Sequence, residues 1–285
     1  RWFYLESEHA GMALQGGALP ENRATQTQPI ENNKKVTTMN KNTLTLRLLA
    51  CLLSTAAAGS AWADSASINY RHQYLDDDRM HADRVKLSYR MDNGWGFEGE
   101  LKYRTAGDRK DVAFDNTVSN GHELTTSYQY KPNAVSTWQP AIQLDSNENG
   151  TTYKFGVRYT HKLSDQFYVA ARYRFDALKL NRDRIDEEVP DRGSDNRNTQ
   201  RYEGWVGYTP AGKLSYEYQY IHFETDYIRY DNKKSDYEQN LIVKYKWDKS
   251  WAPFVEIGDI KVSATEDDRQ LRWRIGVQYL SLIHI

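Results

Sequence analysis

Residues Gln166–Lys179 read QFYVAARYRFDALK, and apolar and polar side chains alternate strictly through them. Every second residue from Phe167 to Phe175 is apolar, whereas Arg172 and Arg174 lie on the opposite parity. Side chains on a strand point alternately to its two faces, so this pattern predicts one apolar and one polar face. An alternating strand of about ten residues has the length of a tilted pass through a bilayer in a closed barrel.

The same pattern returns in RQLRWRIGVQY, residues Arg269–Tyr279, and in ten further segments. We therefore expect an all-β protein, a twelve-stranded antiparallel transmembrane β-barrel. The predicted strands are Ser67–Tyr74, Asp83–Met91, Trp95–Thr105, His122–Lys131, Thr137–Asp145, Thr151–Lys162, Gln166–Lys179, Arg201–Thr209, Lys213–Glu224, Tyr237–Trp247, Trp251–Lys261 and Gln270–Tyr279.

The connections between these segments alternate between short and long. Short turns are predicted at Asp92–Gly94, Pro132–Ser136, Leu163–Asp165, Pro210–Gly212 and Asp248–Ser250. Longer polar connections are predicted at Leu75–Ala82, Ala106–Gly121, Ser146–Gly150, Leu180–Gln200, Thr225–Asp236 and Val262–Arg269. This asymmetry predicts short periplasmic turns and longer extracellular loops. A soluble β-sandwich also alternates, but the strand length and the turn asymmetry disfavour it.

The composition agrees with a barrel and excludes a helical membrane protein. The mean hydropathy is -0.84, and 27% of the residues are charged. The chain has 21 Tyr and 8 Trp, which outer-membrane barrels use in girdles at both membrane interfaces. Its one cysteine, Cys51, precedes the barrel segments, so they contain neither a disulfide nor a thiolate metal site. We expect no cofactor.

A signal peptide is predicted at residues 39–63. Lys41 and Arg47 form a basic region, Leu48–Ala58 is a short apolar segment, and Ala61–Ala63 fits a cleavage site. The mature chain is then expected to begin at Asp64, in the outer membrane of a Gram-negative bacterium. Residues 1–38 are expected to be non-native upstream translation, and residues 280–285 a non-native tail. The barrel is expected to span residues 64–279.

Basic side chains gather on the polar parity of many strands. Residues 64–279 carry 32 basic and 35 acidic residues, so total charge does not indicate a polyanion partner. Arginine on an inner wall would nevertheless bind carboxylates, because its planar fork matches them. The alternative is that these bases pair with inner glutamates and only solvate the wall. The candidate binding residues are Arg71, Arg84, Lys86, Arg104, Arg158, Arg172, Arg174, Arg272 and Arg274.

Four segments resemble the oligogalacturonate-specific porin family of the KdgM type: Tyr70–Tyr74, Val169–Phe175, Tyr216–Tyr220 and Arg272–Tyr279. The resemblance implies a monomeric twelve-stranded barrel whose lumenal arginines pass acidic oligosaccharides by diffusion. It also implies contact with outer-membrane lipid and lipopolysaccharide and recognition by the barrel-assembly machinery. A channel of the same family for sialic acid is similar, so the sugar stays open.

Other function classes have weaker support in the sequence. An outer-membrane protease or phospholipase is the main alternative, but the histidines are scattered and no Gly-x-Ser-x-Gly or His-Glu-x-x-His motif occurs. The five histidines of residues 64–279 are His72, His81, His122, His161 and His222. A structural or adhesive barrel would not need a row of inward bases. Nucleic-acid binding is disfavoured because the bases alternate with lipid-facing residues, and Asp76–Asp78 lacks EF-hand spacing.

Overall fold

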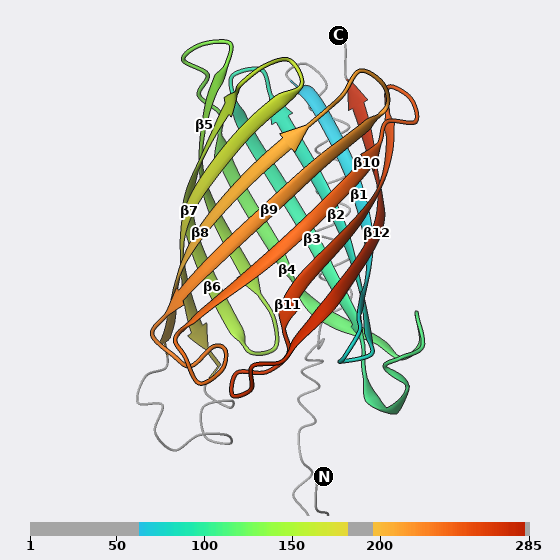
Figure 1. Cartoon of the computed structure of the whole chain (residues 1–285), viewed down its shortest axis with the longest axis vertical. Helices are drawn as coiled ribbons and strands as arrows, with labels where there is room; N and C mark the ends of the chain where they lie inside the picture. The colour runs from blue at the N-terminus through green and yellow to red at the C-terminus, as the bar shows by residue number, and fades with distance from the viewer. Residues whose placement is uncertain (1–62, 182–195, 283–285) are drawn as a thin grey trace, which may run out of the picture. The chain divides into compact units, whose positions relative to one another are not determined.

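The computed structural model describes residues 63–181 and 196–282, which form one closed antiparallel barrel (Figure 1). The strands are β1 (Ala63–Leu75), β2 (Met80–Met91), β3 (Trp95–Thr105), β4 (Thr117–Tyr128), β5 (Ser136–Ser146), β6 (Gly150–Lys162), β7 (Phe167–Leu180), β8 (Asn196–Tyr208), β9 (Leu214–Thr225), β10 (Ser235–Tyr245), β11 (Trp251–Lys261) and β12 (Arg269–Leu282). Each strand pairs with the next along the chain, and β12 pairs with β1. The predicted all-β, twelve-stranded barrel is confirmed.

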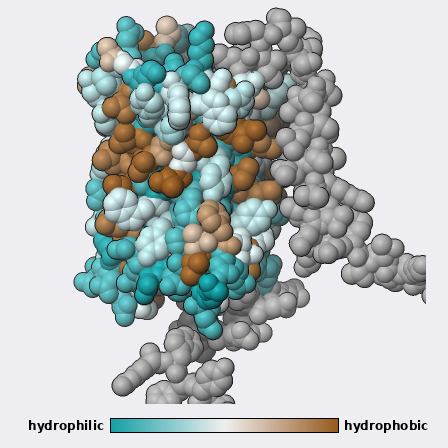
Figure 2. Space-filling model, turned by 90° about the vertical axis from the view of Figure 1, so that its right-hand side faces the viewer, coloured by the Kyte–Doolittle hydropathy of each residue, from teal (hydrophilic) through white to brown (hydrophobic). Residues whose placement is uncertain are grey.

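The alternating pattern separates the two faces of the wall. On β7, Phe167 and Tyr173 are exposed on the outside, whereas Ala170 and Arg174 are buried on the inside. Figure 2 shows apolar side chains gathered around the middle of the outer wall and hydrophilic ones at both ends. This distribution fits an apolar band that faces lipid between two polar ends. Among the described residues, no helix has the length and apolar character to cross a membrane.

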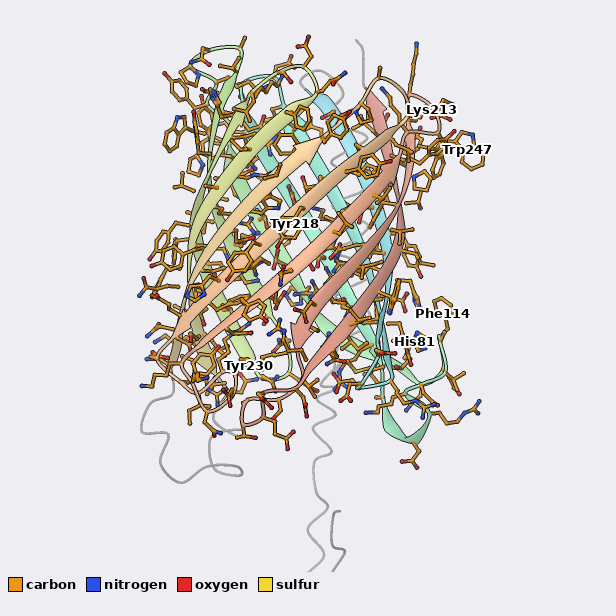
Figure 3. All side chains as sticks on the ribbon, in the orientation of Figure 1. His81, Phe114, Lys213, Tyr218, Tyr230 and Trp247 are labelled. Carbon is orange, nitrogen blue, oxygen red and sulfur yellow. The ribbon has the colours of Figure 1, made fainter. Side chains whose placement is uncertain are left out.

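The two ends of the barrel differ in their connections. We call the end with residues 92–94, 129–135, 163–166, 209–213 and 246–250 the turn end, and the opposite one the loop end. Figure 3 shows Lys213 and Trp247 at the turn end and His81, Phe114 and Tyr230 toward the loop end. Outward aromatic pairs lie near the turn end, with ring centroids 4.4–5.3 Å apart: Trp95–Tyr128, Trp138–Tyr159, Phe167–Tyr208 and Trp251–Tyr279.

Side chains close four of the five connections at the turn end. Asn93, Asn133, Ser164 and Asp248 each accept hydrogen bonds from backbone N–H groups two or three residues ahead. Such side-chain turns fix the hairpin geometry locally. At Asp248 the bonds from the N–H groups of Trp251 and Ser250 lower the pKa of the carboxyl below its ordinary value.

Several predicted boundaries were wrong because the strands extend beyond the membrane-facing segments. The connections predicted at Leu75–Ala82 and Ser146–Gly150 are tight turns of residues 76–79 and 147–149. β4 starts at Thr117 instead of His122, and a register shift between Leu101 and Tyr103 interrupts its pairing with β3. β8 likewise starts at Asn196 instead of Arg201. Above the bilayer both faces are polar, so the backbone ladder continues where the alternation in the sequence fades.

The expectations for the ends of the chain remain predictions. Residues 1–62, with the predicted leader, lie outside the described part. β12 continues past Tyr279, and Leu280 and Ser281 pair with Ser67 and Ala66 of β1. Residues 182–195 of the predicted long connection Leu180–Gln200 also lie outside the described residues.

Strand β12 packs closely against β1, where the barrel closes, and against β11; we call this region the seam. Its geometry predicts that alanine substitutions at two glycines change the stability of the barrel by different amounts. A Cβ at Gly276 would lie 2.4 Å from the Tyr70 carbonyl oxygen and 2.5 Å from the Phe254 ring. At Gly204 an added Cβ meets nothing within 4 Å. We expect Gly276→Ala to destabilise the barrel by about 1–3 kcal/mol through overpacking, and Gly204→Ala to be nearly neutral. Urea unfolding in lipid vesicles measures both; equal midpoints would contradict the seam geometry.

The loop lengths predict which end faces the cell exterior. Asp108 lies in the exposed connection between β3 and β4, and Lys249 in an exposed turn at the opposite end. Because long loops are extracellular in such barrels, Asp108→Cys should react with an impermeant maleimide on intact cells, and Lys249→Cys only after lysis. Since the described residues contain no cysteine, the background is low. Labelling of Lys249→Cys alone on intact cells would reverse the orientation.

Candidate functional site: the lumen of the barrel

Two cavities of about 840 and 510 Å³ lie inside the barrel. Six side chains line both cavities, so they surround the passage between them: Arg71, Arg84, Lys86, Glu98, Arg158 and Arg201. Together the two cavities are lined by twelve basic and seven acidic side chains. The lumen is therefore polar, with an excess of positive charge that is concentrated at the passage.

The structure places eight of the nine predicted site residues on the cavity walls: Arg71, Arg84, Lys86, Arg158, Arg172, Arg174, Arg272 and Arg274. The ninth, Arg104, is not a lining residue of either cavity. It lies near the loop-end terminus of β3 and forms an ion pair with Glu148 at 3.1 Å. The role of these side chains in substrate binding stays a prediction.

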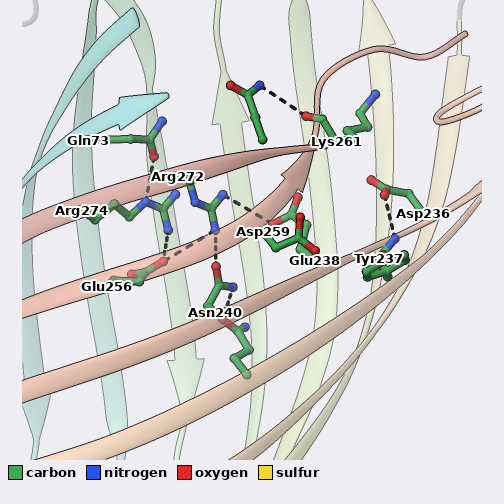
Figure 4. A network of polar contacts seen from close by, with 12 residues as sticks. Gln73, Asp236, Tyr237, Glu238, Asn240, Glu256, Asp259, Lys261, Arg272 and Arg274 are labelled. Carbon is green, nitrogen blue, oxygen red and sulfur yellow. Dashed lines mark hydrogen bonds and ion pairs between the residues drawn. The ribbon is translucent and has the colours of Figure 1, made fainter. Parts of the chain in front are cut away.

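A continuous ladder of charges runs down the wall formed by β10, β11 and β12 (Figure 4). Arg272 lies 3.5 Å from Glu238 and 3.6 Å from Glu256, and its Nη2 donates to the Asn240 side chain at 2.6 Å. Arg274 pairs with Glu256 at 2.5 Å and donates to Gln73 of β1 at 2.7 Å. Acids and bases thus alternate along this wall, and most of their charge is compensated there.

The ladder continues to the loop end through two arginines that the sequence reasoning left out of the site. Arg229, in the connection between β9 and β10, lies 3.1 Å from Asp236 and 3.8 Å from Glu238. Arg269 lies 3.5 Å from Asp236 and 2.8 Å from Asp259. The Asp236 side chain is fully buried between the two guanidiniums. No local signal marks these pairs, because they depend on the register of three strands and a loop.

The arginines that led the sequence argument are held by carboxylates. Arg172 binds Glu203 with two parallel hydrogen bonds of 2.7 and 2.8 Å. Arg174 binds Asp176 in the same bidentate way, at 2.7 and 2.8 Å. The Glu203 side chain is 0% exposed and also pairs with Arg201. The alternative that inner arginines and acids pair with each other therefore describes this part of the wall.

A third set of pairs covers the wall from β2 to β6. Lys154 contacts Glu123 at 2.6 Å and Asp145 at 2.8 Å. Lys102 also reaches Asp145, at 2.7 Å. Two cross-strand pairs complete the set: Arg84–Glu100 at 3.2 Å and Lys86–Glu98 at 3.1 Å.

Arg71 and Arg158 differ from the paired bases. Within residues 63–181 and 196–282, no carboxylate forms an ion pair with either guanidinium. They come from β1 and β6, which are five strands apart round the ring of twelve and so lie on nearly opposite walls. The Nε atoms of Arg84, Arg158 and Arg272 are buried without a hydrogen-bond partner in the described structure. The passage therefore has donors from both walls that the protein's own acids leave unused.

Two histidine clusters lie on the outer wall, away from the lumen. The His72 Nε2 atom forms a hydrogen bond with His81 at 3.0 Å, and its Nδ1 atom lies 2.9 Å from Asp83. The structure thus brings together residues that seemed scattered in the sequence. His161 lies 3.3 Å from Ser136, but no carboxylate among the described residues pairs with His161. The described part of the chain also contains no group of three or more acids, histidines or cysteines placed to hold a metal ion.

Comparison with known proteins agrees with this architecture. The family described as oligogalacturonate-specific porin protein (KdgM) matches residues 59–281. The oligogalacturonate-specific porin KdgM of Dickeya dadantii is 34% identical over 248 residues, which cover 82% of this chain and 99% of the relative. The N-acetylneuraminic acid outer membrane channel protein NanC of Escherichia coli is 20% identical over 240 residues, which cover 82% of this chain and 98% of the relative.

A solved structure described as KdgM porin in complex with disordered oligogalacturonate has a TM-score of 0.56 and 29% identity, and the match covers 75% of this chain and 98% of that chain. These relatives are channels rather than enzymes, and together with the barrel they support a location in the outer membrane. The family match spans nearly all of the described barrel. The chain belongs to the oligogalacturonate-specific porin (KdgM) family.

Proposed function

We propose that this protein is an outer-membrane porin that passes acidic oligosaccharides, oligogalacturonates first among them, by diffusion through its lumen. The observation that carries the proposal is the basic passage between the two cavities, where Arg71 and Arg158 have no carboxylate partner among the described residues. The names of the KdgM relative and of the solved KdgM complex support a polyuronate as the substrate.

The lumen attracts anions because its charges lie between low-dielectric walls. Such walls focus the field of inward charges and raise the local concentration of counter-ions. Guanidinium suits a sugar carboxylate because its N–H groups form two parallel hydrogen bonds to it. Because Arg71 and Arg158 lie on nearly opposite walls, they could bind carboxylates on either side of an oligosaccharide chain in the passage.

The paired arginines contribute in a second way. A sugar carboxylate that reaches Arg272 competes with Glu238 and Glu256, which already occupy that guanidinium. Each such exchange binds the substrate weakly, and several weak sites in series favour conduction over trapping. Arginines two residues apart on one strand lie roughly 7 Å apart, since the rise per residue is about 3.3–3.4 Å. Successive carboxylates of a polyuronate can therefore be passed along the wall.

A channel for an acidic monosaccharide is the second candidate, because the NanC relative is described as an N-acetylneuraminic acid channel. A sugar with one carboxylate would use the same basic passage. It would gain nothing from several arginines in series, whereas a polyuronate would. The dependence of binding on the number of carboxylates separates the two candidates.

The passage arginines predict the ion selectivity. We expect the double variant Arg71→Gln/Arg158→Gln to lower the chloride-over-potassium permeability ratio by about two- to threefold, because roughly one RT of positive potential is removed from the passage. The control Lys131→Gln/Lys249→Gln removes the same charge from exposed positions at the turn end and should leave the ratio unchanged. Reversal potentials across a KCl gradient in planar bilayers measure both. A ratio in the passage variant equal to that of the control would argue against this site.

The sugar preference is tested with single channels and a length series. Galacturonic acid, its dimer and its trimer should block the current with dwell times that grow with each added carboxylate, and maltotriose should block least. Liposome swelling should show net uptake of trigalacturonate. Dwell times that do not depend on length, with equal block by N-acetylneuraminic acid, would favour the monosaccharide channel. Absence of any difference between charged and neutral sugars would refute the acidic-sugar proposal.

A further inference from the structure

Trp205 is a buried tryptophan on the inner face of β8, only 7% exposed. Its neighbours across the sheet are Ala170 on β7 and Gln219 on β9, and the small alanine leaves room for the indole. The guanidinium carbon of Arg158 lies 4.3 Å from the indole centroid, and that of Arg172 lies 5.4 Å from it. The polar inner wall thus contains an aromatic face that is covered by two cations.

The register explains why these cations need an additional contact. Arg158 and Arg172 are directly opposite each other on β6 and β7, and like charges in this position repel. Glu203 neutralises Arg172 through its two hydrogen bonds. No acid in the described part of the chain pairs with Arg158. The indole is therefore a contact that stabilises the Arg158 charge beside a second arginine, together with the Tyr168 hydroxyl.

The kind of contact decides what Arg158 can still bind. A carboxylate partner occupies the N–H edge of a guanidinium, as Glu203 does with Arg172. The indole instead contacts the guanidinium carbon of Arg158 through its π face, and so it does not use up hydrogen-bond donors as a carboxylate does. Glu217 accepts the Tyr168 hydroxyl, and the same hydroxyl contacts the Arg158 guanidinium, so in the described structure Glu217 is linked to Arg158 only through Tyr168.

We propose that Trp205 is a positioning residue that holds Arg158 by its face at the passage between the two cavities, with no carboxylate of the described residues on its N–H groups, so that a substrate carboxylate can bind there. The proposal deepens the proposed function and rests on it for the identity of the ligand. An aromatic partner holds a guanidinium in place without neutralising its charge. This contact explains how the passage keeps an uncompensated positive charge.

The same wall offers an internal comparison. Phe223, on the inner face of β9, is covered by Arg229 at 3.8 Å and by Arg201 at 5.2 Å. Both of these arginines also pair with carboxylates, Arg229 with Asp236 and Arg201 with Glu203. Loss of the Phe223 ring would therefore leave them positioned by their acids. Phe223→Met is a matched control for Trp205→Met, since each variant removes one stacked ring from the lumen.

The test uses the full chain in planar bilayers, after each variant has given a heat-modifiable barrel. Trp205→Met should lower the chloride-over-potassium ratio by about 1.5-fold, which is less than the effect of removing both passage arginines, and should shorten the trigalacturonate dwell time by about two- to fivefold for a lost stacked pair. Trp205→Phe, which keeps a π face, should retain most of both values, and Phe223→Met should resemble the wild type. In an Arg158→Gln background, Trp205→Met should have no further effect. Equal effects in the two backgrounds would overturn the proposal.

If Trp205→Met does not assemble, Trp205→Phe decides the question. A benzene ring holds a cation less strongly than indole, so Arg158→Gln should change the chloride ratio less in Trp205→Phe than in the wild type. An unchanged effect of Arg158→Gln would overturn the role of Trp205.

The chloride measurement also separates this proposal from the proposed function. Chloride selectivity that depends on Trp205, with no block by any acidic sugar, would refute the sugar assignment alone. Block of the Trp205 variants equal to that of the wild type would refute the positioning role alone.

Discussion

Closure of the sheet by the pairing of β1 with β12 is the constraint on which the rest of the structure depends. A bilayer supplies no water to satisfy backbone N–H and C=O groups, so a sheet can span it only when no edge is left. Closure also creates an inside, and the period of two along each strand then gives every strand one lipid face and one lumenal face. The charge network of the lumen is possible because closure separates it from lipid.

Charge compensation is the second constraint. An enclosed lumen cannot hold a dozen cations without acids nearby, and the network from Asp259 to Arg274 supplies them along one wall. Among the described residues, the lumenal charge without an acidic partner lies chiefly at Arg71 and Arg158 in the passage. Selectivity therefore depends less on the number of arginines than on which of them lack an acid. Removing a paired arginine would disturb the wall as well as the pore.

The strands and their inner faces could be predicted from the sequence because a period of two is a local property. The partners of the lumenal arginines could not, because Arg172 meets Glu203 only once the register of β7 and β8 is set. Trp205 was missed because an apolar residue on the polar parity reads as a break in the pattern. The tight turn at residues 76–79 was missed because alternation fades where both faces of a strand meet water.

The side-chain turns at one end of the barrel have a consequence for the order of assembly. Asn93, Asn133, Ser164 and Asp248 close their turns with contacts only two or three residues apart in the chain. Hairpins built on such local contacts form in microseconds. The seam instead pairs Tyr70 with Val277, from opposite ends of the barrel sequence. Pairing of β1 with β12 carries the largest cost in loop-closure entropy. We therefore expect this pairing to form late and slowly, after the hairpins have set the register of the other strands.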